Sequence, residues 1–304
     1  MYQEVSQLLM YGDLEENSIL RQMAELFGKY ETGEYNKTGL VRDINTQVKR
    51  ILKVATDYGF DDNLWHNYLT FFLMMSENPF SMTCEKVGAS EGSVNALVEN
   101  DFRIFKALFD YDFGPIERDL GINCFSQISN YKAIHKKDLM YNKNVSEKVR
   151  SLSKKLEAAK DEKEFFDAVT GFYKDYGVGM FGLNKAFRID DTPQGGFTFR
   201  AINNMDTVML DDLVGYEIQK KKLVDNTEAF VQGKKANNVL LFGDSGTGKS
   251  TSIKAIVNEF YDQGLRMIEI YKHQFKDLSN VIAAVKNRNY KFIIYMDDLS
   301  FEEF

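Results

Sequence analysis

The sequence is short of cysteine and proline, and the two shortages exclude several classes of protein. Its 304 residues include two cysteines and three prolines. Cys84 and Cys124 stand far apart with neither CxxC nor CxH spacing, which excludes a disulfide framework and a cysteine-built zinc site. The scarcity of proline, with no proline-rich or serine-rich stretch, excludes a collagen-like tract and a long disordered linker. We expect both cysteines to be buried thiols in a reducing compartment.

Long apolar runs are also missing. The longest apolar cluster covers residues 68–75, far below the roughly 20 residues needed to cross a bilayer. The N-terminus carries acids where a signal peptide needs a basic start and an apolar stretch. We therefore expect a cytoplasmic protein with no membrane partner. His66, His135 and His273 are the three histidines, and their isolation gives no metal-ligand spacing.

Positive charge is in deficit over the whole chain but in excess in one stretch. The 38 Lys and Arg against 45 Asp and Glu give a net charge of −7, which argues against a surface coated with cations for nucleic acid or anionic lipid. Residues 132–160 hold nine basic and three acidic residues, a local net charge of 9 − 3 = +6. Two interpretations stay open: a footprint for nucleic acid or another acidic partner, or a solvated helical face.

Hydrophobic periodicity divides the chain into two domains, 1–204 and 205–304. In the first, apolar residues recur at spacings of three and four, which predicts a mostly helical domain with helices over 40–58, 61–75, 90–109, 146–159 and 162–176. A glycine-rich aromatic stretch over 176–189 is predicted to lead out of this domain. One short strand is predicted after it, over 197–202. We expect the boundary near Asn204.

The second domain alternates strand and helix patterns. Short apolar runs predict strands over 239–242, 267–271 and 292–296, and helical spacing predicts helices over 253–261 and 278–285. Strand, helix, strand, helix, strand is typical of an α/β fold with a parallel sheet flanked by helices.

A complete phosphate-binding motif stands between the first predicted strand and helix of that domain. It reads Gly243, Asp244, Ser245, Gly246, Thr247, Gly248, Lys249 and Ser250, with Thr251 next on the helix. The glycines let backbone N–H groups turn toward phosphate oxygens, and the helix that begins at Lys249 adds the positive end of its dipole. Lys249 supplies a mobile charge for phosphates, and the Ser250 hydroxyl can ligate Mg²⁺. We expect bound ATP and Mg²⁺.

The last predicted strand ends in two carboxylates, as a P-loop site requires. Asp297 is the expected residue of the Mg²⁺ shell, and Asp298 stands where a general base would orient the attacking water. This position more often carries Glu, which is one methylene longer. Either the water moves closer, or hydrolysis is slow, or Glu302 or Glu303 contributes.

With both motifs in place, the second domain resembles the AAA+ branch of P-loop ATPases. The stretch LDDLVGYEIQKKKL (210–223) resembles the segment that packs on adenine in that branch, which would put Leu213, Val214, Gly215 and Tyr216 in the base pocket. Tyr216 could equally be a core aromatic. The Asp-Asp ending is similar to that of the initiator and helicase-loader branches of AAA+.

A closer resemblance is to an uncharacterised bacterial family of predicted ATPases, domain of unknown function 815. It rests on YGVGMFGLNKAFR (176–188), LDDLVGY, NNVLLFGDSGTGKS (237–250) and MDDLSFEE (296–303), with a weaker likeness at ENPFSMTCEK (77–86). The family implies an ATPase and gives no substrate.

An AAA+ core of this kind implies more than these 304 residues encode. It implies two further strands, a sensor residue, an arginine finger and a helical lid. We therefore expect a chain truncated after the Walker B strand, with an unfilled gap in its sheet and poor hydrolysis on its own.

The sequence thus predicts a Mg²⁺-dependent ATPase of AAA+ type that couples the nucleotide cycle to remodelling of an unknown protein or nucleic-acid partner. An arginine from a neighbouring subunit would complete the site, which implies a homo-oligomer. The alternative is a nucleotide-dependent DNA- or protein-binding loader or switch with little hydrolysis. A small-molecule kinase ranks third, since it needs an acceptor-binding lid.

Overall fold

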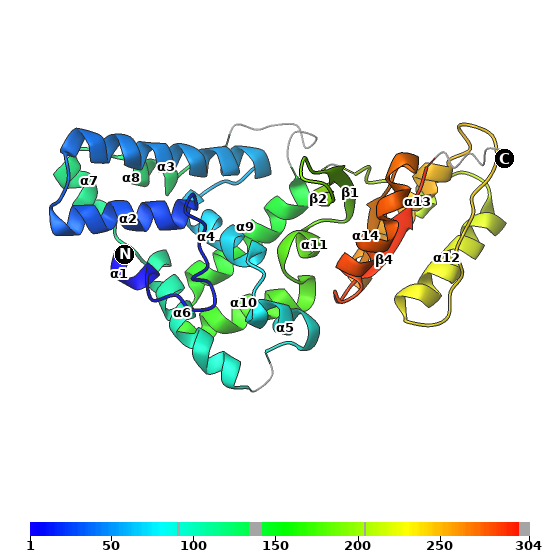
Figure 1. Ribbon diagram of the computed structural model, residues 1–304, viewed down its shortest axis with the longest axis horizontal. Helices are drawn as coiled ribbons and strands as arrows, with labels where there is room; N and C mark the ends of the chain where they lie inside the picture. The colour runs from blue at the N-terminus through cyan, green and yellow to red at the C-terminus, as the bar shows by residue number, and fades with distance from the viewer. Residues whose placement is uncertain (90–91, 134–141, 204, 298–304) are drawn as a thin grey trace. The chain divides into compact units, whose positions relative to one another are not determined.

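The computed structural model describes residues 1–304 except 90–91, 134–141, 204 and 298–304 (Figure 1). The chain forms two compact units, Met1–Leu183 and Asn184–Phe304. We had expected a boundary near position 204, which itself lies outside the described residues. The division falls earlier because residues 186–201 pair in the sheet of the second unit.

The first unit is mostly helical in its described part, where turns and loops join the helices and the extended pairing is an isolated bridge between Asp62 and Tyr131. Its helices are α1 (Tyr2–Val5), α2 (Ile19–Thr32), α3 (Lys37–Tyr58), α4 (Leu64–Met75), α5 (Pro79–Val87), α6 (Ser93–Phe109), α7 (Gly114–Leu120), α8 (Cys124–Ile128), α9 (Lys143–Ala158), α10 (Glu162–Tyr176) and α11 (Gly179–Leu183). The helical prediction is confirmed: α10 has the expected bounds, and the other expected helices are found with one or both ends shifted by a few residues.

Local capping explains where these helices begin and end. The Asn36 side chain accepts a hydrogen bond from the Gly39 N–H at the start of α3, and Gly59, in the left-handed region at φ 69°, ends it. At α10 the Asp161 carboxylate accepts from the Glu164 N–H. Each cap satisfies a backbone group that the helix itself leaves without a partner.

A large aromatic core holds the helices of this unit together. Trp65, Phe80, Phe102, Phe105 and Phe165 are all at most 1% exposed. A buried carboxylate ties the N-terminal segment to α6: Asp101, fully buried, accepts hydrogen bonds from the N–H groups of residues 9, 10 and 11.

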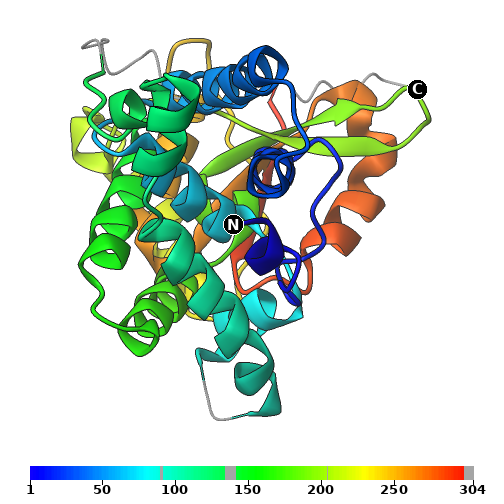
Figure 2. The same cartoon turned by 90° about the vertical axis from the view of Figure 1, so that its left-hand side faces the viewer.

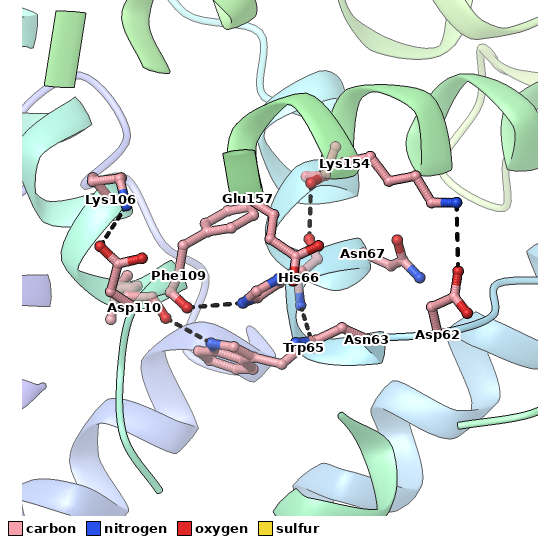
Figure 3. Close-up of polar contacts among 12 residues, drawn as sticks. Asp62, Asn63, Trp65, His66, Asn67, Lys106, Phe109, Asp110, Lys154 and Glu157 are labelled. Carbon is pink, nitrogen blue, oxygen red and sulfur yellow. Dashed lines mark hydrogen bonds and ion pairs between the residues drawn. The ribbon is translucent and has the colours of Figure 1, made fainter. Parts of the chain in front are cut away.

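The first turn of α4 is joined by polar contacts to α6 and α9 (Figure 3). The Trp65 indole N–H donates to the Leu108 carbonyl at 2.9 Å. His66 contacts the Phe109 carbonyl through Nε2 at 2.8 Å, which fixes the proton on that nitrogen, and its Nδ1 faces Glu157 Oε1 at 3.8 Å. Burial lowers the pKa of His66, because the charged imidazolium is poorly solvated there.

The second unit has a four-stranded mixed sheet in the order β2-β1-β3-β4. The strands are β1 (Ala186–Asp191), β2 (Phe197–Ala201), β3 (Leu265–Glu269) and β4 (Lys291–Tyr295). β1 and β2 form an antiparallel hairpin, the long light-green pair of Figure 2. β1 runs parallel to β3, and β3 runs parallel to β4.

Helices accompany this sheet. They are α12 (Glu217–Val231), α13 (Lys249–Phe260) and α14 (Leu278–Val285), with 3-10 turns η2 (Leu210–Asp212), η3 (Tyr261–Gln263) and η4 (Lys272–Asp277). One apolar cluster joins α12 and α13 to the strands: Ile253, Ile256, Val257 and Phe260 of α13 lie with Ala186, Leu223, Leu265 and Met267. The sheet therefore holds α13 in place, and α13 carries the phosphate-binding motif at its start.

Two predictions about the strands were wrong. Residues 239–242 do not form a strand, and Val239, Leu240 and Phe242 are 49%, 66% and 89% exposed. An extended segment becomes a stable strand only when its N–H and C=O groups find partners, and no described strand pairs with this one. Conversely, residues 186–191, read as part of an exit segment, form β1 in the middle of the sheet. The sheet is consequently mixed rather than purely parallel.

Candidate functional site

The candidate site is built on the loop before α13, whose backbone requires glycine. Gly243, Gly246 and Gly248 have φ of 143°, 79° and 81°, values that residues with a Cβ rarely adopt. Gly248 is the N-cap of α13 and no side chain caps the helix. The first N–H groups of α13 therefore lack intrahelical partners and carry the positive end of the helix dipole.

Lys249 closes this loop on itself. Its ammonium donates hydrogen bonds to the carbonyls of Gly243 and Asp244 at 2.9 and 2.8 Å. The Thr247 hydroxyl donates to the same Asp244 carbonyl at 2.8 Å. Residues 243–246 are exposed and 247–251, which include Thr251, are half-buried. The arrangement is a curled, glycine-rich backbone with one cation beside it, open to solvent on the side of Asp244 and Ser245.

The first turn of α13 meets the segment after β4. The Ser250 hydroxyl donates to Asp297 Oδ2 at 3.2 Å, across 47 sequence positions. A hydroxyl and a carboxylate side by side are the hard oxygen ligands that Mg²⁺ prefers. The structure thus places Lys249 against the loop and Ser250 against Asp297.

Tyr295, the last residue of β4, belongs to the same group, and the sequence analysis missed it. Burial is the main cause that raises its pKa to about 12, while hydrogen bonding to Ser250 lowers this pKa and hydrogen bonding to Asp297 raises it. A partial signal was available, because residues two apart share a face as long as a strand continues, although β4 ends at Tyr295. Tyr295 stands two positions before Asp297.

Among the expected adenine-binding residues, Leu213 lies near the loop, and no contact that the structure describes brings Val214, Gly215 or Tyr216 to it. Val214 and Tyr216 are 95% and 57% exposed, and Gly215 has φ 84°. At this exposure, Tyr216 is not a core aromatic either. Leu213 is the nearest of the group: a Cβ placed on Gly248 would lie 4.0 Å from Leu213 Cδ2. The Lys220 ammonium holds the Leu213 carbonyl at 2.7 Å.

Several other residues with predicted roles fall outside the part of the chain that the structure describes. Asp298, Glu302, Glu303 and His135 fall outside the described residues, as does the part of the basic stretch that covers 134–141. In its described part, Lys143 pairs with Glu147 at 4.0 Å and Lys154 with Asp62 at 3.8 Å. Within the described chain, no three His, Cys, Asp or Glu residues group as metal ligands.

The remaining expectations concern cysteine and the membrane. Both cysteines are free thiols; Cys84 is buried and Cys124 half-buried, and burial raises the pKa of the Cys84 thiol to about 11. A search of the described residues for a helix with the length and apolarity of a membrane span finds none.

Comparison with known proteins gives one match. Residues 183–304 match the model of a family described as "Protein of unknown function (DUF815)". The match begins one residue before the second unit and includes the loop, α13 and β4, so the resemblance to this family is confirmed for that unit. No curated protein and no solved structure matches the chain.

Proposed function

We propose that the second unit is a Mg²⁺-dependent ATP-binding site of the P-loop, AAA+ type. The observation that carries the proposal is the contact between Ser250 Oγ and Asp297 Oδ2 at 3.2 Å. Taken alone, the Gly243–Ser250 motif could be only a glycine-rich turn, and the acidic end of the last strand could be only a solvated cap. A nucleotide–metal site needs the two segments in contact, and neither of these simpler interpretations requires that contact.

The loop chemistry suits a polyphosphate. The Lys249 ammonium, now on the Gly243 and Asp244 carbonyls, can exchange these neutral acceptors for phosphate oxygens, which bind a cation more strongly. The N–H groups of the loop and of the first turn of α13 would donate to the same phosphates. Positive charge and donors thus converge on one anion.

The oxygen pair suits Mg²⁺. Ser250 would ligate the ion directly, and Asp297 would hold its shell. When bound, Mg²⁺ neutralises phosphate charge as it develops during transfer to water. Asp298 is the proposed general base that orients this water, with Glu302 as the alternative.

The proposed biological role is ATP-driven remodelling of an unknown protein or nucleic-acid partner by a homo-oligomer in which a neighbouring subunit supplies an arginine. The second candidate is a nucleotide-dependent binding switch with little hydrolysis. It is favoured by Asp at position 298, because this shorter side chain reaches the attacking water less readily than Glu. ATP turnover, measured with and without DNA, separates the two.

Nucleotide binding is the first test. Calorimetric titration with MgATP should give binding to the wild-type chain and none to Lys249→Ala. The matched control is Lys254→Ala, on the same helix, where the ammonium pairs with Asp206 at 2.7 Å. Equal binding by wild type and Lys249→Ala would remove the phosphate-site assignment, and loss of binding in Lys254→Ala would point to a general effect on α13.

A further inference from the structure

Residues 205–213, here called the strap, run along α13 from near its last turn to its N-cap. The Asn258 amide of α13 donates hydrogen bonds to two carbonyls of the strap, at 2.8 and 2.9 Å. At the other end Leu213 lies beside the N-cap, since a Cβ placed on Gly248 would be 4.0 Å from Leu213 Cδ2. The strap is therefore in contact with α13 at both ends, and its Leu213 end lies at the phosphate loop.

Lys220 of α12 anchors that end of the strap. Its ammonium donates to the Leu213 carbonyl at 2.7 Å and pairs with Glu217 at 2.8 Å. The Lys220 side chain is 16% exposed and that of Glu217 is 77% exposed. A hydrogen bond from a charged donor is strong where water is largely excluded, whereas an ion pair with an exposed acid contributes little. The bond to the Leu213 carbonyl is therefore the contact that holds the strap.

The turn after Leu213 makes this anchor necessary. Gly215 and Tyr216 both have positive φ, 84° and 57°, and a residue with a side chain adopts such a backbone at a cost. Val214 is 95% exposed, so it adds little burial. Lys220 bridges this unfavourable turn by bonding from α12 back to Leu213.

The phosphate loop needs a support that persists when a ligand binds. The Lys249 ammonium ties the loop through the carbonyls of Gly243 and Asp244. In the proposed site this ammonium moves to phosphate oxygens, so the loop loses that tie as the ligand binds. Leu213 lies against Gly248 from outside the motif, and this contact does not depend on Lys249. It can hold the left-handed backbone of Gly248, at φ 81°, in the shape that receives the phosphates.

We propose that Lys220 is a positioning residue for the phosphate loop: it holds Leu213 against Gly248 and so keeps the loop ready for the phosphates. This inference rests on the proposed ATP site and adds a residue from outside both motifs. It also gives Leu213 a role at the phosphates, whereas the resemblance to AAA+ implies a role at the base. The two roles can be separated, because only a role at the phosphates affects a ligand that has no base.

The test is Lys220→Met, which keeps an unbranched side chain and deletes the ammonium. Affinity is measured for MgATP and for tripolyphosphate with Mg²⁺, which offers the phosphate chain without a base. Both dissociation constants should rise by about tenfold, as expected for the loss of a hydrogen bond from a charged donor. Lys220→Arg, which keeps a charged donor, should recover most of this loss.

Two control variants separate this contact from its surroundings. Lys222→Met makes the same substitution at an exposed position of α12. Glu217→Gln removes the exposed partner of Lys220 and leaves the bond to the Leu213 carbonyl. Both should bind each ligand within about twofold of wild type.

A further variant removes the same contact from the other side. Leu213→Ala shortens the side chain that lies against Gly248 and leaves the Leu213 carbonyl for Lys220. It should also raise both dissociation constants. The double variant with Lys220→Met should bind within about twofold of the weaker single variant, because the two changes remove one shared contact.

Three results would overturn the inference while leaving the ATP site standing. The first is wild-type affinity for both ligands in Lys220→Met. The second is a loss for MgATP alone, which would place Leu213 at the base. The third is wild type that binds MgATP but not tripolyphosphate, since a preformed loop should hold the phosphate chain by itself. Absence of Lys249-dependent MgATP binding in wild type would overturn the ATP site and the inference together.

Discussion

The Ser250 hydroxyl and the Asp297 carboxylate meet at 3.2 Å although 47 positions separate them in the chain. One sits in the first turn of α13 and the other follows β4, so the parallel pairing of β4 with β3 and the packing of α13 on the same sheet bring them together. A polar contact that depends on this much tertiary structure is more informative than either motif, because a short motif alone can occur by chance.

Replacing Asp297 with asparagine should separate metal binding from nucleotide binding. The amide oxygen of Asp297→Asn can still accept the Ser250 hydrogen bond, but the charge that attracts Mg²⁺ is lost. We expect the gain in ATP affinity on adding Mg²⁺ to fall by at least about tenfold, and ATP binding with EDTA to hold or improve slightly because a negative charge near the phosphates is removed. Calorimetry with and without Mg²⁺ measures both, and an undiminished gain would contradict the role of Asp297.

The local part of the architecture was predictable from the sequence. Helices α3 and α10 could be predicted from amphipathic spacing, because the caps and apolar stripe that define each helix lie within it or next to it in the sequence. The Gly243–Ser250 loop was equally readable, since its three positive φ values fall on glycines of the motif.

Tertiary pairing was not predictable in the same way. The apolar run 239–242 has strand composition but no described partner, and residues 186–191 form a strand because β2 and β3 lie on either side. Composition expresses only a preference for extended backbone, whereas a strand forms only where neighbouring strands pair with it. Tyr295 was missed for a related reason: the burial that raises its pKa depends on elements packed around the end of β4, not on its neighbours in the sequence.

The buried carboxylate of Asp101 should be essential to the first unit. It is fully buried and accepts N–H bonds from Leu9, Met10 and Tyr11 at 2.8 to 3.1 Å. In Asp101→Asn one of the two oxygens becomes an NH₂ group, which would face at least one of these donors, and the negative charge that the donors solvate is lost, so we expect a loss of about 3 kcal/mol in the free energy of unfolding. Fluorescence of Trp65, the single tryptophan and 1% exposed, reports this unit during urea unfolding. Wild-type stability in the variant would contradict this role.

His66 should make the first unit sensitive to mild acid. Burial lowers its pKa from 6.5, against the opposing effects of the Phe109 carbonyl, Glu157 and Asp110, while Lys106 lowers it further. As pH falls below 6.5 the unfolded chain takes up a proton that the folded chain does not, so the free energy of unfolding decreases with falling pH through that window. His66→Gln, whose amide can still donate to the Phe109 carbonyl, should show a smaller decrease.

The quantity to compare is the free energy of unfolding of wild type minus that of His66→Gln at each pH, since other groups titrate equally in both. Urea unfolding followed by Trp65 fluorescence from neutral pH into the acid range should give curves of stability that diverge below the ordinary pKa of histidine. Parallel curves would mean that the environment of His66 does not shift its titration.

Two glycines of the first unit should respond in opposite directions to alanine. Gly171 lies inside α10 and a Cβ there meets nothing within 4 Å, so Gly171→Ala should stabilise by about 0.5–1 kcal/mol through the lower entropy of the unfolded chain. At Gly182 a Cβ would lie 2.7 Å from the Gly177 carbonyl carbon and 2.9 Å from the Tyr176 oxygen.

Since backbone cannot move aside as a flexible side chain can, Gly182→Ala should destabilise the unit by about 1–3 kcal/mol. The same substitution at two sites serves as its own control, because both variants add one methyl group. Urea midpoints from Trp65 fluorescence should therefore move up for Gly171→Ala and down for Gly182→Ala. A shift of both in the same direction would mean that backbone packing around α11 differs from the contacts described above.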